Sequence, residues 1–217
     1  MALAGNIGLR AAEARAVTIA NTPCLIVKRY DRQASASGEV LRLHQEDFCQ
    51  ALEFPPSRKY QQEGGPSLRD CFALLRDWSS APVLDIRDFL KGVILATLTG
   101  NADAHAKNFS ILYADGKRRI TPLSDQVCTL AWPELSKTLS MKIGSAVSLA
   151  EVSPEHFKQL SIEAKLSWPM LRERLTDLCQ KTVDAIRSDA IPNTSTIAAD
   201  TTLNRAERML RLMGGRK

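Results

Sequence analysis

One short polar run, together with the segment that follows it, constrains the fold of this chain more than any other feature. The run spans residues 101–108 and reads Asn-Ala-Asp-Ala-His-Ala-Lys-Asn. Two β-like stretches follow, residues 109–113 and 118–121, with Ala-Asp-Gly-Lys between them. An Asp-Gly pair between two such stretches is typical of a tight hairpin. Because an isolated Asp125 comes next, the sequence predicts a polar loop, a hairpin and a carboxylate, in that order.

Asp103 and Asn108 stand five positions apart, which is the spacing of a protein-kinase catalytic loop. A kinase site needs a carboxylate that accepts the substrate's hydroxyl proton, and oxygen ligands for Mg²⁺. We therefore predict that Asp103 is the base and that Asn108 and Asp125 are the metal ligands. His105 and Lys107 would add hydrogen bonds or positive charge near the phosphates. Taken alone, the same spacing is more often a polar turn capped by its own side chains.

A metal-dependent hydrolase is a second interpretation of this run. Asp103, His105 and Asp125 are a possible set of ligands for Zn²⁺ or Mn²⁺, although only one histidine is available there. Tight metal binding that needs no nucleotide and that His105→Ala destroys would favour the hydrolase. Retention of Mg²⁺ only together with ATP would favour the kinase.

Composition excludes several classes of protein. Apolar residues make up 44% of the chain, too many for a disordered protein. No run approaches the roughly 20 apolar residues of a membrane span, and the start Met-Ala-Leu-Ala lacks the basic residues of a signal peptide. The five cysteines form no CxxC pair, so we expect reduced, buried thiols in a cytoplasmic protein. A net charge of +5 is too small to predict direct binding of nucleic acid.

Helical patterns precede the polar run. Residues 86–97 carry apolar side chains along one stripe, and we expect Asp85 to cap this helix. The helix would end at the polar run and support it from beneath. Ser67 is expected to cap an earlier helix over residues 68–78, with Trp78 in the core.

Three further segments complete the expected framework. Leu25-Ile-Val27 predicts a short buried strand, and Ser153 followed by proline predicts the start of a helix. Residues 188–202 are expected to be a polar linker to a last basic helix over residues 203–213. Three arginines would lie on one side of that helix, facing solvent or, alternatively, a phosphate or a partner: Arg205, Arg208 and Arg211.

The run Asn101–Ser110 resembles the signature of HipA-type serine/threonine kinases, the toxins of bacterial toxin–antitoxin modules. Other segments resemble blocks of the same family and occur in the same order. These are Val27–Arg32, Arg42–Leu52, Lys59-Tyr60 with Gly64–Ser67, Thr121–Asp125 and Leu139–Gly144. The resemblance covers roughly residues 20–145.

The resemblance implies a kinase that uses ATP and Mg²⁺ to phosphorylate a serine or threonine of a protein, which in this family includes aminoacyl-tRNA synthetases. It also implies an antitoxin partner, which can be bound to DNA. Asp103 would be the catalytic base, and Asn108 and Asp125 would bind the metal. Lys28 and Tyr30 would belong to the hinge that meets adenine.

The chain departs from the family before the hinge, where a full member has a small lobe with an ATP-binding lysine and a phosphate loop. We therefore expect residues 1–32 to be a remnant of the small lobe with the hinge strand, and residues 33–217 to be the large lobe. The expected fold is mainly α (α+β), a kinase-like large lobe with a short β-hairpin at the catalytic site. Either a partner subunit supplies the rest, or the chain is an incomplete lobe that serves as a binding or regulatory component.

Overall fold

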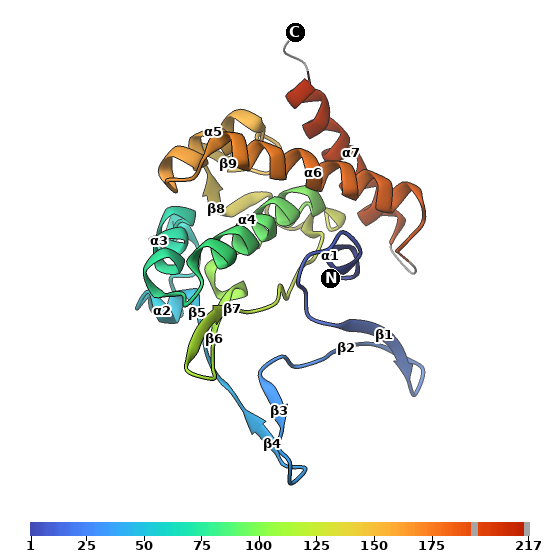
Figure 1. Ribbon diagram of the computed structural model, residues 1–217. Coiled ribbons are helices and arrows are strands. Elements are labelled where there is room, and N and C mark those ends of the chain that lie inside the picture. Colours follow the sequence, from blue (N-terminus) through green and yellow to red (C-terminus); the bar gives the residue numbers. More distant parts are fainter. Residues whose placement is uncertain (192–194, 215–217) are drawn as a thin grey trace.

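Two long helices form the centre of the molecule because each is apolar along one side. Figure 1 presents the computed structural model, which describes residues 1–191 and 195–214. Helix α4 (Pro82–Thr99) buries Phe89, Leu90 and Ile94 completely, and α6 (Trp168–Arg187) does the same with Leu171 and Leu175. The other helices pack around this pair: α1 (Ala2–Asn6), α2 (Phe48–Ala51), α3 (Leu68–Trp78), α5 (Pro154–Glu163) and α7 (Thr196–Gly214).

The capping residues predicted for two helices are confirmed. Ser67 accepts a hydrogen bond from the backbone of Asp70, whose side chain accepts one in return from the Ser67 N–H, and α3 follows over residues 68–78. The same reciprocal arrangement joins Ser153 to His156 at the start of α5. Each pair satisfies backbone donors that a helix start otherwise leaves unpaired.

The cap predicted at Asp85 is wrong. Helix α4 begins at Pro82, so Asp85 lies inside its first turn, and its side chain is fully buried. Proline suits the first helical position because its fixed φ matches the helix and its missing N–H needs no partner. The carboxylate of Asp85 is therefore available to other parts of the chain.

A three-stranded antiparallel sheet lies beside the helices, in the order β5 (His44–Asp47), β6 (Ser110–Ala114) and β7 (Lys117–Ile120). Strands β6 and β7 form the predicted hairpin, and Ala114 pairs with Lys117. Both turn residues have positive φ, +51° at Asp115 and +69° at Gly116. This is the two-residue turn that Asp-Gly favours, so the hairpin prediction is confirmed.

Two ribbons project from the helical body, as Figure 1 shows. One pairs β1 (Ala14–Ile19) with β2 (Thr22–Val27), and the other pairs β3 (Arg32–Ala34) with β4 (Val40–Arg42). The buried strand predicted at residues 25–27 is wrong, because Leu25 is 67% exposed and Val27 37% exposed. In the described part of the chain, no third strand pairs with either ribbon. An apolar run therefore predicted the strand but not its burial.

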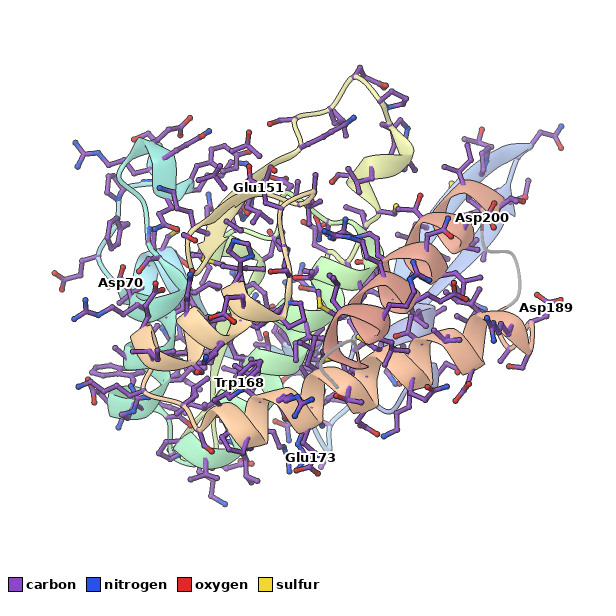
Figure 2. All side chains as sticks on the ribbon, turned by 90° about the horizontal axis from the view of Figure 1, so that it is seen from above. Asp70, Glu151, Trp168, Glu173, Asp189 and Asp200 are labelled. Carbon is purple, nitrogen blue, oxygen red and sulfur yellow. The ribbon has the colours of Figure 1, made fainter. Side chains whose placement is uncertain are left out.

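The last helix is longer than predicted, and two of its arginines bond to the body. Helix α7 begins at Thr196, inside the segment expected to be a linker, and lies beside α6 (Figure 2). Arg205 donates to the carbonyls of Thr97 (2.6 Å) and Leu149 (3.1 Å), and Arg208 donates to that of Val152 (3.1 Å). Burial lowers the pKa of Arg205 to about 10. The predicted solvated face is therefore wrong for Arg205, whereas Arg208 is exposed and still bonds to the body.

Trp78 also differs from its prediction. Its side chain is 42% exposed rather than in the core, and its Nε1 donates to the hydroxyl of Tyr113 at 2.9 Å. The guanidinium of Arg118 lies 4.5 Å from the centre of its ring. The polar N–H of tryptophan and the cation on its face hold it at the surface.

The remaining elements are short, and several of them border the polar run. They are the 3₁₀ turns η1 (Gln61–Glu63), η2 (Ala106–Asn108) and η3 (Thr129–Ala131), and the strands β8 (Thr138–Ile143) and β9 (Ala146–Ser148). All five cysteines are free thiols, and three of them, Cys49, Cys71 and Cys179, are buried. Within residues 1–191 and 195–214, no helix combines the length and the apolar character that crossing a membrane requires.

Candidate active site

Helix α4 delivers the polar run, as predicted. It ends at Gly100, whose φ of +73° is left-handed and whose N–H bonds to carbonyls of the last turn. A Cβ at this position would also lie 2.9 Å from Leu130 Cδ1. Glycine is therefore required by both the backbone conformation and the space, and the chain can turn sharply from the helix into the loop.

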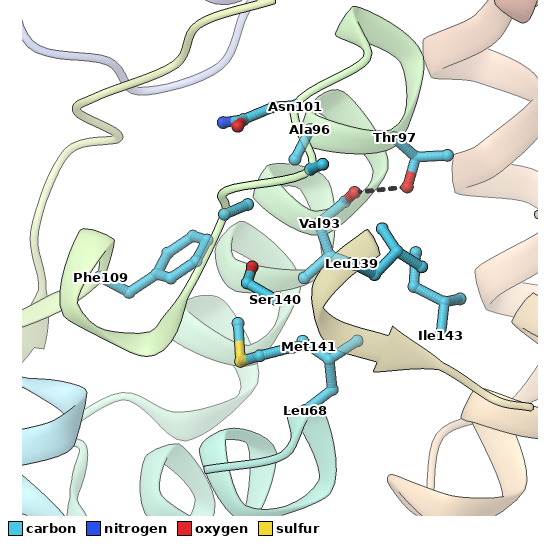
Figure 3. Close-up of a pocket in the computed structure, with 12 residues that line it drawn as sticks. Leu68, Val93, Ala96, Thr97, Asn101, Phe109, Leu139, Ser140, Met141 and Ile143 are labelled. Carbon is cyan, nitrogen blue, oxygen red and sulfur yellow. Dashed lines mark hydrogen bonds between the residues drawn. The ribbon is translucent and has the colours of Figure 1, made fainter. Parts of the chain in front are cut away.

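Four contacts fix the loop after this turn. The buried side chain of Asn101 accepts from the Asp103 N–H at 3.1 Å. The hydroxyl of Thr129 donates to the Gly100 carbonyl (3.0 Å) and accepts from the Ala102 N–H (2.9 Å), and the Ser140 N–H bonds to the Ala102 carbonyl (2.9 Å). A cavity of about 20 Å³ lies beneath the loop, between Asn101 and strand β8 (Figure 3). The loop is thus preorganised by the buried Asn101 within it and by the buried Thr129 and Ser140 outside it.

The two residues at the ends of the kinase-like spacing are brought together. The side-chain nitrogen of Asn108 donates to the Asp103 carbonyl at 3.0 Å, and the Asn108 N–H bonds to the His105 carbonyl at 2.9 Å. The first bond uses the amide nitrogen and leaves the amide oxygen of Asn108 available to a cation. The carboxylate of Asp103 is 47% exposed, so a substrate hydroxyl can reach it.

His105 lies between Asp103 and a lysine from another segment. Its Nε2 is 3.9 Å from Asp103 Oδ2 and 3.1 Å from Lys59 Nζ, and the ring of Tyr60 packs edge-on against it. Burial lowers the pKa of His105, the carboxylate of Asp103 opposes this, and the ammonium of Lys59 adds to it. The sequence assigned no role to Lys59, although Lys59-Tyr60 is one of the blocks that resemble the family.

Asp125 borders a large cleft. It is exposed and has a φ of +54°. The segment before it is held by residues 10–12: Leu123 N–H bonds to the Arg10 carbonyl and Ala12 N–H to that of Leu123, both at 2.8 Å. The cleft has a volume of about 710 Å³ and separates residues 124–127 from the inner face of the β1–β2 ribbon. Its walls include Ala14, Ala16, Leu25, Val27 and Val127.

This cleft and its carboxylate suit a nucleotide and a hard cation. Ligand pockets of this size are mostly apolar and carry a few well-placed polar groups. Asp125 and the free amide oxygen of Asn108 supply oxygen ligands of the kind that Mg²⁺ prefers. In residues 1–191 and 195–214, no three His, Cys, Asp or Glu side chains form a cluster that could hold a metal ion. Asp103, His105 and Asp125, the ligands of the hydrolase interpretation, therefore do not form one.

Three of the predicted site residues lie apart from this centre. Lys28 extends from the end of β2 and pairs with Glu13 at 3.0 Å, with both side chains exposed. None of the described hydrogen bonds or ion pairs joins Lys28 or Tyr30 to Asp103 or Asp125. Lys107 is exposed, and its charge acts on the thiol of Cys49, whose pKa is raised to about 11 mainly by burial. The geometry therefore brings Lys59, rather than Lys107, to His105.

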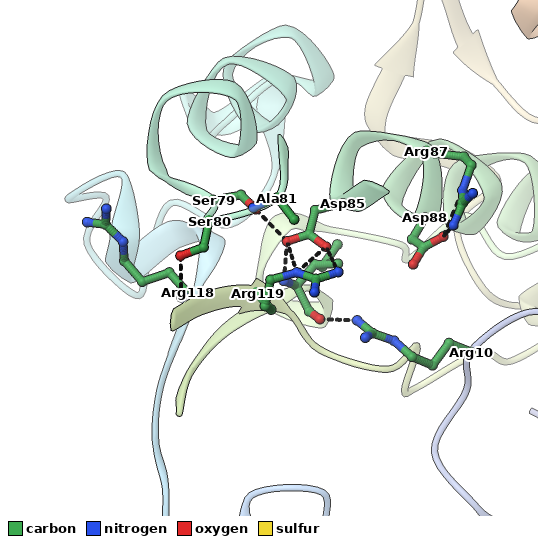
Figure 4. Close-up of polar contacts among 10 residues, drawn as sticks. Arg10, Ser79, Ser80, Ala81, Asp85, Arg87, Asp88, Arg118 and Arg119 are labelled. Carbon is green, nitrogen blue, oxygen red and sulfur yellow. Dashed lines mark hydrogen bonds and ion pairs between the residues drawn. The ribbon is translucent and has the colours of Figure 1, made fainter. Parts of the chain in front are cut away.

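A buried carboxylate ties the hairpin to the helix that carries the loop. Asp85 accepts from the Ser79 hydroxyl (2.6 Å), the Arg119 guanidinium (2.9 Å) and the Ile120 N–H (2.9 Å), as Figure 4 shows. Arg10 bonds to the Ile120 carbonyl from the other side. Asp125 follows strand β7 in the chain. The Asp85 hub, meaning Asp85 with its partners Ser79, Arg119 and Ile120, therefore fixes the position of the hairpin's end relative to α4.

Comparison with known proteins identifies several similar sequences. A family model described as the HipA-like C-terminal domain matches residues 1–187. The protein Y4mE of Sinorhizobium fredii is 45% identical over 186 residues, covering 86% of this chain and 44% of Y4mE. The serine/threonine-protein kinase toxin HipA of Shewanella oneidensis is 34% identical over 155 residues, covering 66% of this chain and 36% of HipA. The chain thus spans less than half the length of these relatives.

Two solved structures show a similar fold. One is the complex of HipA, HipB and operator DNA from the toxin–antitoxin system of Shewanella oneidensis. The similarity has a TM-score of 0.90 at 26% identity and covers 99% of this chain and 55% of the other. The other is the proinflammatory kinase CtkA of Helicobacter pylori, with a TM-score of 0.56 at 14% identity, covering 99% of this chain and 82% of CtkA. The second likeness concerns the fold alone, and together they confirm the kinase-like large lobe predicted from the sequence.

Proposed function

This chain belongs to the family of HipA-like C-terminal domains, and on that basis we propose that it is the catalytic lobe of an ATP- and Mg²⁺-dependent serine/threonine protein kinase. The single observation that carries the proposal is the loop in which Asn108 bonds to Asp103 across their five-residue spacing. Asp125, whose charge acts on His105 of this loop, borders a nucleotide-sized cleft.

The proposed reaction needs alignment and charge neutralisation more than covalent work by the protein. Asp103 holds the serine or threonine hydroxyl and takes its proton as the oxygen forms a bond to the γ-phosphorus of ATP. The bond from that phosphorus to the oxygen of ADP breaks, and ADP leaves. Bound Mg²⁺ supplies neutralisation of the phosphate charge. Asn108 and Asp125 would hold it through their side-chain oxygens.

The β1–β2 ribbon supplies the other wall of the nucleotide site in this proposal. Residues 1–32 form the part of the small lobe that reaches the hinge, and residues 33–217 form the large lobe. Adenine would pack against the apolar side chains of β2 that line the cleft, with Lys28 and Tyr30 just beyond them at the hinge. The role of Lys28 to Tyr30 is to meet adenine through backbone groups.

The partners proposed for this chain follow from its relatives. A protein substrate, such as an aminoacyl-tRNA synthetase, would offer the hydroxyl. An antitoxin bound to operator DNA is supported by the similar HipA, whose structure contains HipB and DNA. The proposed location is the cytoplasm, where such partners and ATP are found.

A second candidate function is a catalytically incomplete lobe that acts as a binding or regulatory component of a toxin–antitoxin complex. The observation that favours it is the β1–β2 ribbon, in which Ile19 (56%) and Leu25 (67%) are exposed. An open ribbon with exposed apolar residues is suited to completion by a partner subunit. In that case the nucleotide site would form only in the assembly.

Calorimetric titration of the purified chain with Mg-ATP tests the proposal. We expect binding that Asp125→Ala weakens by at least tenfold, because a ligand of the metal is lost. Asp103→Asn should retain ATP but lower phosphotransfer by several orders of magnitude in any active assembly, because the base is lost. Wild-type transfer by both variants would refute the assignment. Absence of Mg-ATP binding would favour the incomplete lobe, and tight Zn²⁺ binding without nucleotide would favour the hydrolase.

A further inference from the structure

A lysine from outside the polar run reaches the candidate base through one histidine. The Nζ of Lys59 is 3.1 Å from His105 Nε2, and His105 Nε2 is 3.9 Å from Asp103 Oδ2. Lys59 is only partly exposed. Among the described residues, it is the one lysine or arginine with a side-chain hydrogen bond to a side chain of the polar run.

The segment that carries Lys59 is fixed by its own contacts. The Tyr60 carbonyl accepts from the N–H groups of Glu63 (3.0 Å) and Gly65 (2.9 Å). A Cβ on Gly65 would lie 2.6 Å from the Arg58 carbonyl, so the chain packs closely on itself here. Next along, the side chain of Gln61 accepts from the backbone of Lys142 on β8 at 2.7 Å. The lysine therefore stands on a preorganised turn that is joined to the body.

The ammonium group lies over an aromatic face and lacks a carboxylate partner. Its Nζ is 4.7 Å from the centre of the Tyr60 ring. No carboxylate of the described residues lies within 4.0 Å of it, and the charge of Asp103 acts from farther away. Because an ammonium only donates hydrogen bonds, His105 Nε2 must be the acceptor, and the proton of the neutral ring lies on Nδ1. The bond to His105 aims the cation at the site without neutralising its charge.

The chemistry that such a cation fits is an anion with several oxygens. In phosphoryl transfer, negative charge spreads over the three equatorial oxygens of the transferred group. Asn108 and Asp125 serve the metal, and Lys59 comes from a different segment beside the base. A lysine binds phosphate as a point charge, and a hydrogen bond between two charged groups is stronger than a neutral one.

We propose that Lys59 binds the phosphoryl group during its transfer to the hydroxyl held by Asp103. This inference rests on the proposed function and adds a catalytic residue to it. The bond from phosphorus to the substrate oxygen forms, the bond to ADP breaks, and the hydroxyl proton passes to Asp103. Lys59 keeps its own proton throughout, with one N–H directed to His105 and the others to the phosphoryl oxygens.

The test compares Mg-ADP with Mg-ADP plus beryllium fluoride, which mimics the phosphoryl group, by calorimetry on the full chain. We expect the fluoride to tighten binding in the wild type. Lys59→Met should keep the affinity for Mg-ADP. The increase in affinity that beryllium fluoride causes should be smaller in Lys59→Met, by a factor on the order of tenfold. Lys59→Arg should keep most of that increase. Lys142→Met is the matched control, because it removes an equal charge from neighbouring strand β8 and should behave like the wild type.

Each outcome decides the proposal. Thermal unfolding shows whether Lys59→Met is folded. If the folded variant keeps the full fluoride-dependent increase in affinity, the proposed role of Lys59 is overturned, and the proposed kinase function still stands. A wild type that binds Mg-ADP without any gain from fluoride would overturn the proposed role of Lys59 as well. If the wild type does not bind Mg-ADP, the proposed function fails for the chain alone, and inorganic phosphate becomes the probe. A phosphate-dependent shift of the His105 ring signal that Lys59→Met removes would then support the phosphoryl site, and no such shift would overturn it.

Discussion

The polar loop and the β1–β4 ribbons differ in how the body holds them. The loop at residues 100–108 ends a buried helix and is clamped by Thr129 and Ser140. The ribbons expose Leu25, Val40 and Leu41 by half or more and pair only within themselves among the described residues. The groups that we assign to proton transfer thus lie on rigid packing, whereas the wall that we assign to adenine does not.

This difference indicates which segments open locally and which open only when the whole fold unfolds. Segments with few buried contacts open locally at a low free energy, whereas segments in the core open only when the whole fold does. We expect substitutions at the loop and its supports to change global unfolding. Equivalent substitutions in the ribbons should change local opening and the shape of the cleft.

The largest effect is expected from Asp85→Ala, with Asp31→Ala as the matched change in the ribbon region. Each carboxylate is fully buried and bonded to arginine. Removing Asp85 leaves Arg119 and the Ile120 N–H without their partner inside the body, which should lower the free energy of unfolding by roughly 3 to 5 kcal/mol. Urea denaturation measures this. If Asp31→Ala lowers the free energy of unfolding by an equal amount, the ribbons unfold together with the core, and the loop and the ribbons do not differ in stability.

A smaller effect is expected from Gly100→Ala, compared with Gly38→Ala in the turn between β3 and β4. Both glycines have positive φ, so alanine should cost each site roughly 1 to 2 kcal/mol. A new Cβ would meet Leu130 at Gly100 but nothing within 4 Å at Gly38. We expect Gly100→Ala to lower both the midpoint of urea denaturation and phosphotransfer. Gly38→Ala should change only hydrogen exchange in β3 and β4, and a loss of transfer there would tie the ribbon to the chemistry.

The smallest effect is a dependence on pH in the ribbon region. The guanidinium of Arg29, followed by that of Arg32, lowers the pKa of Asp31 to about 2. Because the folded pKa lies below the ordinary value near 4, the ionised form stabilises the fold above that value, and this contribution is lost as the pH falls towards 2. The Leu43 N–H, which bonds to the Asp31 carbonyl, should lose protection against hydrogen exchange over that window. An Asp31→Asn variant that shows the same dependence would assign it to other groups.

Local signals in the sequence predicted the features that depend on neighbouring residues. Ser67 and Ser153 each cap a helix by exchanging hydrogen bonds with the residue three positions later. Asp115-Gly116 closes the hairpin because both residues adopt positive φ. The spacing of Asp103 and Asn108 also closes within one loop. Each of these needs only a short stretch of chain, so a pattern of residue types is enough to predict it.

Long-range partners account for the wrong predictions. Asp85 looks like a helix cap in sequence, but its partners on β7 lie 34 and 35 positions away. Arg205 looks like part of a solvated face, but it bonds to a carbonyl at the end of α4, 108 positions away. Leu25 to Val27 read as a buried strand, because apolar character does not reveal whether another layer covers it.

The sequence by itself determined the order of the chemical groups: a carboxylate, an amide, a hairpin and a second carboxylate, with a helix beneath them. The tertiary structure alone decided which distant side chains join that centre, above all Lys59 at His105 and the Asp85 hub that positions β7. Periodicity and spacing describe contacts within a turn or a hairpin, where the covalent chain fixes the geometry. Contacts between distant segments depend on how the helices and strands pack, which no local pattern encodes.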